Sequence, residues 1–92
     1  MSDVNTPRET IMEFPCDFPL KIMGAHHEAF ADTMLAVVQQ HAPDTQAHHV
    51  STRLSSKGNY IGATIVVNAI SQEQLDNIYR SLTAHPLVKV AY

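Results

Sequence analysis

The stretch RLSSKGNYIG, residues 53–62, holds the densest group of side chains whose types suit binding chemistry. Its hydroxyls, its lysine amine and its glycine are groups that anion-binding loops use to hold a phosphate or a carboxylate. Such a loop usually leads from a strand into a helix, whereas this one leads into residues that alternate like a strand. Gly58 and Asn59 also tolerate the backbone conformations of a tight antiparallel turn. We therefore predict a hairpin connection, with contact to a ligand or partner left open as a second role.

The chain contains six histidines, including two adjacent pairs, which suggests zinc binding as a second kind of chemistry. Zinc sites need three or four ligands at spacings, such as HxxxH or CxxC, that bring them together. Adjacent histidines on a strand, as expected for His48 and His49, point to opposite faces and chelate poorly. The fold predicted below divides the histidines between its two ends, with His26, His27 and His85 at one end and His41, His48 and His49 at the other. We predict no bound metal and no other cofactor.

The sequence also shows no grouping of residues that is typical of a catalytic site. Cys16 lies between Pro15 and Asp17, and the neighbouring carboxylate opposes formation of a reactive thiolate. Paired carboxylates for acid–base catalysis should face a cleft from different elements. The acidic residues that can be placed fall on helix surfaces, namely Glu28, Asp32, Glu73 and Asp76. We predict that the protein is not an enzyme and has no catalytic residues.

The bulk composition narrows the possible partners. The 92 residues carry six Lys and Arg against nine Asp and Glu, for a net charge of −3. Nucleic-acid binding normally leaves a basic footprint, so DNA is excluded as a partner and RNA is disfavoured. A single cysteine fits a reducing compartment, and no apolar run approaches the roughly 20 residues that cross a bilayer. We expect a cytoplasmic protein that does not contact membranes.

Hydrophobic periodicity predicts four strands and two helices in the order β-α-β-β-α-β. The second strand should turn Val50, Thr52 and Leu54 toward the helices, and a capping box from Ser71 to Gln74 should open the second helix. In chain order, the predicted elements are a strand at 18–24, a helix at 28–42, strands at 48–55 and 60–69, a helix from 71 to 84, and a strand at 87–92.

This order predicts an α+β fold of the ferredoxin-like type, a two-layer sandwich. Its antiparallel sheet should have the strand order 4-1-3-2, with both helices on one face. Residues 11–92 form this single domain, and the polar stretch 1–10 is expected to be a flexible tail.

Two surfaces of the predicted fold are candidates for binding. At one end of the sheet, loops meet beside a helix N-terminus, whose partial positive charge suits a small ligand. We call this the rim, with Gly24, His26, His27, Ser55, Ser56, Lys57, Gly58 and His85. The second surface is the open face of the sheet, with Lys21, Met23, His49, Arg53, Tyr60, Thr64, Asn68 and Lys89.

Several motifs together resemble the YbeD-like family of small bacterial proteins of unknown function. They are KIMG at 21–24, HAP at 41–43, SSKGNY at 55–60, TIVVNA at 64–69 and EQLDNIYRSLTAHPLVK at 73–89. The resemblance covers residues 11–92 and implies a fold similar to the ACT regulatory domains. Those domains bind small ligands such as amino acids at subunit interfaces, beside a glycine that corresponds to Gly24. The resemblance also implies an association with lipoate metabolism through gene context, and it implies no catalytic residue.

The leading hypothesis is a non-catalytic regulatory or protein-interaction module that acts through the open face or the rim. Its partner would be another protein or a second copy of the chain. The alternative is an ACT-like sensor that binds a small molecule at the rim. RNA binding through the open face is disfavoured, because Tyr60 is the one clear aromatic candidate there and the net charge is negative.

Overall fold

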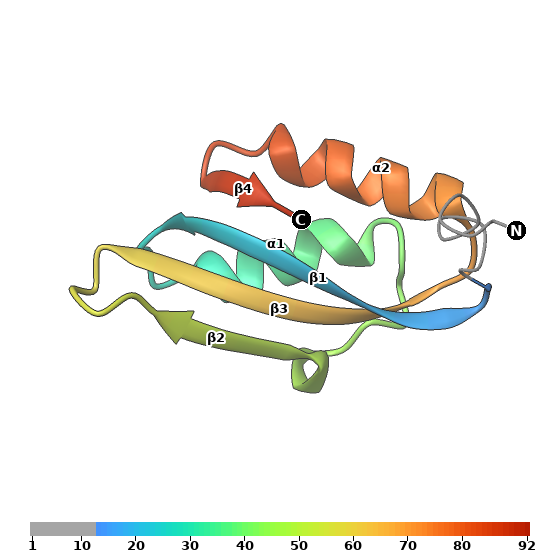
Figure 1. The fold of residues 1–92 in the computed structure, drawn as a ribbon, viewed down its shortest axis with the longest axis horizontal. Helices are drawn as coiled ribbons and strands as arrows, with labels where there is room; N and C mark the ends of the chain where they lie inside the picture. The colour runs from blue at the N-terminus through green and yellow to red at the C-terminus, as the bar shows by residue number, and fades with distance from the viewer. Residues whose placement is uncertain (1–12) are drawn as a thin grey trace, which may run out of the picture.

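The computed structural model describes residues 13–92, so the tail predicted at 1–10 lies outside the described residues. The described strands form one antiparallel sheet in the order β2-β3-β1-β4, with both helices on one face (Figure 1). This confirms the predicted α+β, ferredoxin-like arrangement. The elements are β1 (Cys16–Ala25), α1 (Phe30–Gln39), the short 3-10 helix η2 (Ala47–His49), β2 (Val50–Leu54), β3 (Tyr60–Ala69), α2 (Gln72–Thr83) and β4 (Val88–Ala91).

The two central strands, β1 and β3, pair over their full length, from Cys16 opposite Ala69 to Ala25 opposite Tyr60. A proline inside a central strand normally breaks the hydrogen-bond ladder. Pro19 is tolerated because its backbone nitrogen points the same way as that of Lys21, toward the side of β1 where β4 pairs. The Lys21 N–H donates to the Tyr92 carbonyl oxygen there at 2.8 Å. Pairing with β4 does not extend as far as Pro19 within the described residues, so no ladder bond is lost there.

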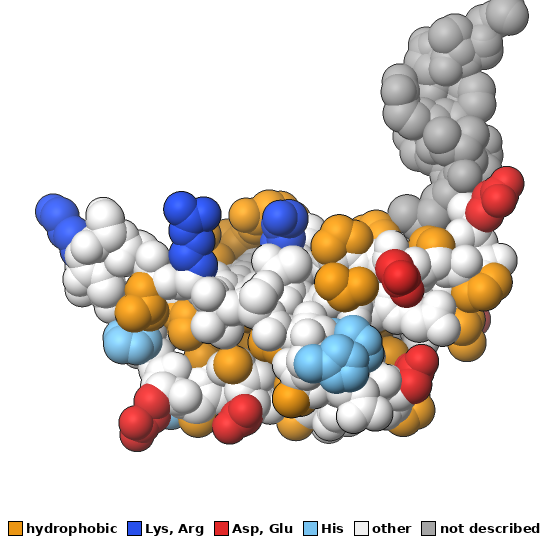
Figure 2. Space-filling model, turned by 90° about the horizontal axis from the view of Figure 1, so that it is seen from below, with side chains coloured by type: hydrophobic (Ala, Val, Ile, Leu, Met, Phe, Trp, Pro, Cys, Tyr) orange, Lys and Arg blue, Asp and Glu red, His pale blue; other side chains and the backbone are white. Residues whose placement is uncertain are grey.

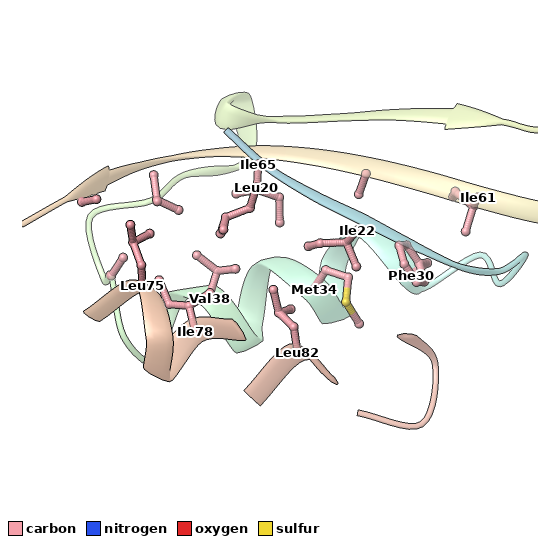
Figure 3. Packing of buried hydrophobic residues seen from close by; sticks show 14 residues of the cluster. Leu20, Ile22, Phe30, Met34, Val38, Ile61, Ile65, Leu75, Ile78 and Leu82 are labelled. Atoms are coloured by element: carbon pink, nitrogen blue, oxygen red, sulfur yellow. The ribbon is translucent and has the colours of Figure 1, made fainter. Parts of the chain in front are cut away.

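The core lies between the sheet and the two helices (Figure 3). Each fully buried aliphatic or aromatic side chain contributes about 1.5–3 kcal/mol relative to an exposed one. Period-2 alternation in the strands and 3.6-residue periodicity in the helices bring these side chains to one layer. The largest are Leu20, Ile22, Phe30, Met34, Val38, Ile65, Val67, Leu75, Ile78 and Leu82.

The two helices are joined at one end by polar contacts as well as by the core. Ser71 Oγ accepts a hydrogen bond from the Gln74 N–H at 3.1 Å, as the predicted cap requires. Gln74 Oε1 accepts from the Ile70 N–H, one residue earlier than in a standard capping box. The same side chain donates to the His41 carbonyl oxygen at 2.9 Å. Gln74 therefore fixes the start of α2 against the end of α1.

The second strand departs from its prediction. It begins at Val50 rather than His48, and of its predicted core residues Val50 is half-buried while Thr52 and Leu54 are exposed. The alternation is correct, but β2 is an edge strand, and of its residues Val50 alone packs against the core. Alternation specifies which face of the sheet a side chain points to, whereas the area that the helices cover decides whether that side chain is shielded from solvent.

Candidate functional site

Two of the loops assigned to the rim lie next to each other. The His26 N–H donates to the Asn59 carbonyl oxygen at 3.0 Å, which joins the loop after β1 to the β2–β3 connection. Gly24, however, is buried beneath the loop that precedes β4. A Cβ atom at this position would collide with the Leu87 carbonyl oxygen and come within 2.6 Å of the Phe30 ring. Close packing within the protein therefore accounts for this glycine.

The stretch SSKGN is a hairpin turn, as predicted. The Ser55 N–H donates to the Tyr60 carbonyl oxygen at 3.0 Å, and the Gly58 N–H donates to the Ser55 carbonyl oxygen at 2.9 Å. Ser55 Oγ accepts from the Tyr60 N–H at 3.2 Å, and Gly58 has the positive φ of 75° that an L side chain rarely adopts. Ser55 and Gly58 thus build the turn, while Ser56 and Lys57 are exposed on it.

Three histidine rings accept backbone hydrogen bonds at Nδ1. His27 accepts from the Ala29 N–H, His49 from the Gln46 N–H and His85 from the Leu87 N–H, at 2.9–3.1 Å. Each bond spans two or three residues, so these rings stabilise local turns. Within residues 13–92, no three His, Cys, Asp or Glu side chains are arranged to hold a metal ion.

One prediction about the histidines was wrong. His48 and His49 were expected on a strand with their rings on opposite faces. They lie instead in the 3-10 helix η2, and their ring centroids are 4.1 Å apart. The tighter helical turn, with about three residues per turn, replaces the alternation of a strand here.

A hollow of about 500 Å³ lies over the open face, above β1, β2 and β3. We call it the open-face groove. The strand register places Gly62 at its centre, with Met23 on one side and Arg53 on the other. One row along, Thr64 lies between Lys21 and Ser51. The side chains on this face are therefore those of Lys21, Met23, Ser51, Arg53, Tyr60 and Thr64, with Tyr92 also lining the groove.

Large apolar side chains are exposed in and beside this groove. Met23, Tyr60, Val90 and Tyr92 retain 40, 47, 47 and 60% of their accessible surface. Val90 pairs with Met23, and Tyr92 exchanges backbone hydrogen bonds with Lys21. A contiguous apolar patch of this kind on a small domain is typical of an interaction surface.

The groove also differs in charge from the rest of the molecule. Lys21 and Arg53 line it, whereas no Asp or Glu of the described segment does. Figure 2 shows Lys and Arg side chains along one margin, with hydrophobic side chains between them, and most Asp and Glu side chains along the opposite margin or toward one end. A protein of net charge −3 thus presents a locally cationic, apolar surface.

The residues predicted for the open face divide into separate places. Lys21, Met23, Arg53, Tyr60 and Thr64 line the open-face groove. His49 and Asn68 lie instead in a smaller hollow of about 130 Å³, with Asp17, Asp44, Thr45 and Val66.

Lys89 lines neither hollow and is exposed in β4, next to an irregularity in its pairing with β1. Sequence reasoning missed Gly62, Val90 and Tyr92 as site residues. For the last two, the alternation of the final strand carried the signal, because Val90 and Tyr92 share a face.

The fold and the groove define a small ferredoxin-like domain with one packed and one open sheet face. The chain belongs to the family described as "Protein of unknown function (DUF493)", whose model matches residues 9–92. This is the same family as the YbeD-like proteins, so the resemblance found in the sequence is confirmed.

Similar proteins carry the name UPF0250 protein. One from Neisseria gonorrhoeae is 63% identical over 83 residues, which cover 90% of this chain and 91% of that protein. Others come from Paraburkholderia phytofirmans, 57% identical over 98% of both chains, and Ralstonia nicotianae, 48% identical over 98% of both chains. These names assign no activity. Among residues 13–92, no helix has the length and apolar character needed to cross a bilayer.

Proposed function

We propose that this protein is a non-catalytic protein-interaction module that binds its partner through the open-face groove. The observation that carries the proposal is the exposure of Met23, Tyr60 and Tyr92 around a hollow that Lys21 and Arg53 line. Aromatic residues, Met and Arg are the types enriched where proteins contact one another. They are also the types that supply most binding energy when a partner covers them.

The shape of the groove supports a macromolecular partner. Small-molecule pockets are concave and cover about 70–90% of the ligand surface. The open-face groove instead spans three neighbouring strands and is open to solvent along the sheet. Such a surface suits a segment or a face of another protein.

The chemistry of the groove supports a binding role rather than catalysis. Its titratable side chains are those of Lys21, Arg53, Tyr60 and Tyr92, and no His, Cys, Asp or Glu of the described residues lines it. No His, Asp or Glu of the described residues is therefore placed there to activate a hydroxyl such as that of Ser51.

The alternative function, a small-molecule sensor at the rim, stays a prediction, and no specific observation on the described residues favours it. In the ACT-like hypothesis the ligand approaches Gly24. Here the Leu87 carbonyl and the Phe30 ring occupy the space beside that glycine.

Affinity capture from the native cell, with matched charge reversals, tests the proposed function. The wild-type chain and a Lys21→Glu, Arg53→Glu variant are compared as baits. Arg80→Glu, on the exposed surface of α2, serves as the control for charge. Lys57→Glu, on the exposed hairpin, separates the rim from the face.

We expect proteins that the wild type and Arg80→Glu retain to be lost from the double variant and kept by Lys57→Glu. Equal capture by all four folded baits would exclude the groove. Loss with Lys57→Glu alone would move the site to the rim. Circular dichroism of each bait confirms that the comparison concerns folded protein.

A further inference from the structure

Gly62 occupies a position where the fold does not require glycine. It lies in the interior of β3, where glycine normally weakens a strand. Among the described residues, a Cβ atom added there would come within 4 Å only of the Arg53 and Ile22 carbonyl oxygens, both at 3.8 Å, which is ordinary van der Waals contact. Its φ also lies outside the positive range, which among the described glycines Gly58 alone adopts. Neither packing nor backbone conformation therefore explains the residue.

The place of Gly62 on the sheet offers an explanation. Its neighbours along the strand, Ile61 and Ala63, point into the core, so a side chain at Gly62 would stand on the open face. It would rise between Met23 and Arg53, at the centre of the groove. The missing side chain is what keeps the groove floor low, and strand glycines often mark a site where a ligand or another chain approaches closely.

The walls of the groove indicate the chemistry of its occupant. Lys21 on β1 and Arg53 on β2 lie on opposite sides of β3, and their Cα atoms are roughly 12 Å apart, because they differ by two strand spacings and by two residues of register. Gly62 lies on β3 between these two strands, with the apolar side chain of Met23 opposite Arg53 across it and that of Tyr60 two residues along β3. An occupant that satisfies all of these groups carries negative charge on either side of a large apolar side chain.

We propose that the groove binds an acidic segment of a partner protein, with one aromatic or branched aliphatic side chain seated on Gly62 and carboxylates beside Lys21 and Arg53. This rests on the proposed function and names the partner's chemistry. Nucleic acid fits less well, because affinity for it depends on many phosphate contacts and the described residues bring two cations, Lys21 and Arg53, to the groove. A second copy docked through the same face would bring the cations of both copies together in a symmetric contact.

Synthetic peptides titrated into the isotope-labelled full chain test the proposal by NMR. The central probe is an octapeptide with Glu-Phe-Glu between Gly-Ser flanks. Three matched probes replace both glutamates by glutamine, both glutamates by lysine, or the phenylalanine by alanine. We expect the Glu-Phe-Glu peptide to shift amide resonances of β1, β2 and β3 around Gly62. The glutamine and alanine probes should bind at least tenfold more weakly, and the lysine probe should not bind.

Gly62 variants separate binding from folding. Gly62→Val fills the groove with a residue that favours strands, and Gly62→Ala fills it partly. We expect Gly62→Val to lose the Glu-Phe-Glu peptide, and Gly62→Ala to bind it several-fold more weakly, while both unfold at or above the wild-type temperature. Arg80→Glu is the matched control and should bind like the wild type.

Three results would overturn the proposal. They are equal binding of the glutamate and glutamine probes, unchanged binding by Gly62→Val, and shifts confined to another surface or absent with every probe.

Tighter binding of an octauridine strand would make the partner RNA, and a concentration-dependent dimer lost in Gly62→Val would make it a second copy. If the lysate capture still depends on Lys21 and Arg53, the proposed function stands while the acidic segment fails. If the capture is also insensitive to them, both fail.

Discussion

The two faces of the same sheet follow different rules, and β3 shows the difference within a single strand. On one face, Ile61, Ala63, Ile65 and Val67 are buried against the helices. On the other, Tyr60 remains exposed, and Gly62 and Thr64 are partly exposed along the groove. Close packing limits each residue on the first face to one size and shape. The second face has no such limit, so the residues found there are free to serve a partner.

Gly24 and Gly62 show the same contrast between a packed position and an open one. The Leu87 carbonyl and the Phe30 ring fill the space beside Gly24, which leaves no room for a side chain. The space above Gly62 is open enough for one. A glycine that the fold needs and a glycine that the fold merely tolerates therefore occur on adjacent strands. Substitutions at matched positions on the two faces should therefore differ in their effect on stability.

The largest effect is expected from truncating the packed face of β1. Leu20→Ala removes a fully buried side chain and should lower the free energy of unfolding by about 2–5 kcal/mol. Met23→Ala, on the open face of the same strand, should change it by less than about 1 kcal/mol. Urea denaturation of both variants measures the difference. Similar losses from the two would show that the open face is packed in solution, for example by self-association.

A methyl group added at each glycine gives the next largest effect. Gly24→Ala should destabilise the protein by about 1–3 kcal/mol, because Leu87 and Phe30 must shift to admit the new atom. Gly62→Ala should be neutral or stabilising by up to about 1 kcal/mol, since alanine fits the space and costs less conformational entropy. Thermal unfolding of the pair is the measurement. A clear loss of stability in Gly62→Ala would mean that the fold, and not a partner, requires this glycine.

The edge strand supplies a smaller effect that tests how far the covered face extends. Leu54 points in the helix direction but is 52% exposed. Leu54→Thr should therefore change the free energy of unfolding by no more than about 0.5 kcal/mol. Its matched control is Val67→Thr on β3, where an unpaired hydroxyl enters the buried layer and should cost about 1–3 kcal/mol. Equal effects of the two substitutions would place β2 beneath the helices after all.

The smallest effect concerns pH. Burial on the helix side raises the pKa of Tyr79 above its ordinary value of about 10. Below pH 10 this phenol is protonated in both states, so its contribution to stability is fully present. As the pH rises above 10, the unfolded chain ionises first and the folded state loses stability until the raised pKa is passed.

Tyr79→Phe should accordingly show a shallower loss of stability above pH 10 than the wild type does. Tyr60→Phe, on the open face, is the control for removing a phenol hydroxyl outside the core. Denaturation midpoints between pH 8 and pH 11 compare the three proteins. If stability falls equally with pH in Tyr79→Phe and in the wild type, burial of Tyr79 does not contribute to the pH dependence.

The fold could be predicted because local signals agreed with one another. The long alternation of β3 and the cap at Ser71 located their elements, and the element order then required the antiparallel topology. The site could be predicted only in part. Periodicity assigns Lys21, Met23 and Arg53 to one face, but it carries no information on where that face is hollow or how far the helices extend over the other. His49 was placed incorrectly in a strand because a single helical turn of three residues has no periodic signal.

The amino-acid sequence by itself determined the element order, the apolar face of each element and the turn at Gly58. Each depends on backbone preferences or on side-chain spacing within about a dozen residues. Tertiary structure alone decided that Gly24 is buried, that Leu54 is not, and that Tyr92 lies beside Lys21 near Gly62. Those outcomes depend on atoms from segments distant in the chain, because both burial and an open groove are properties of the space between elements.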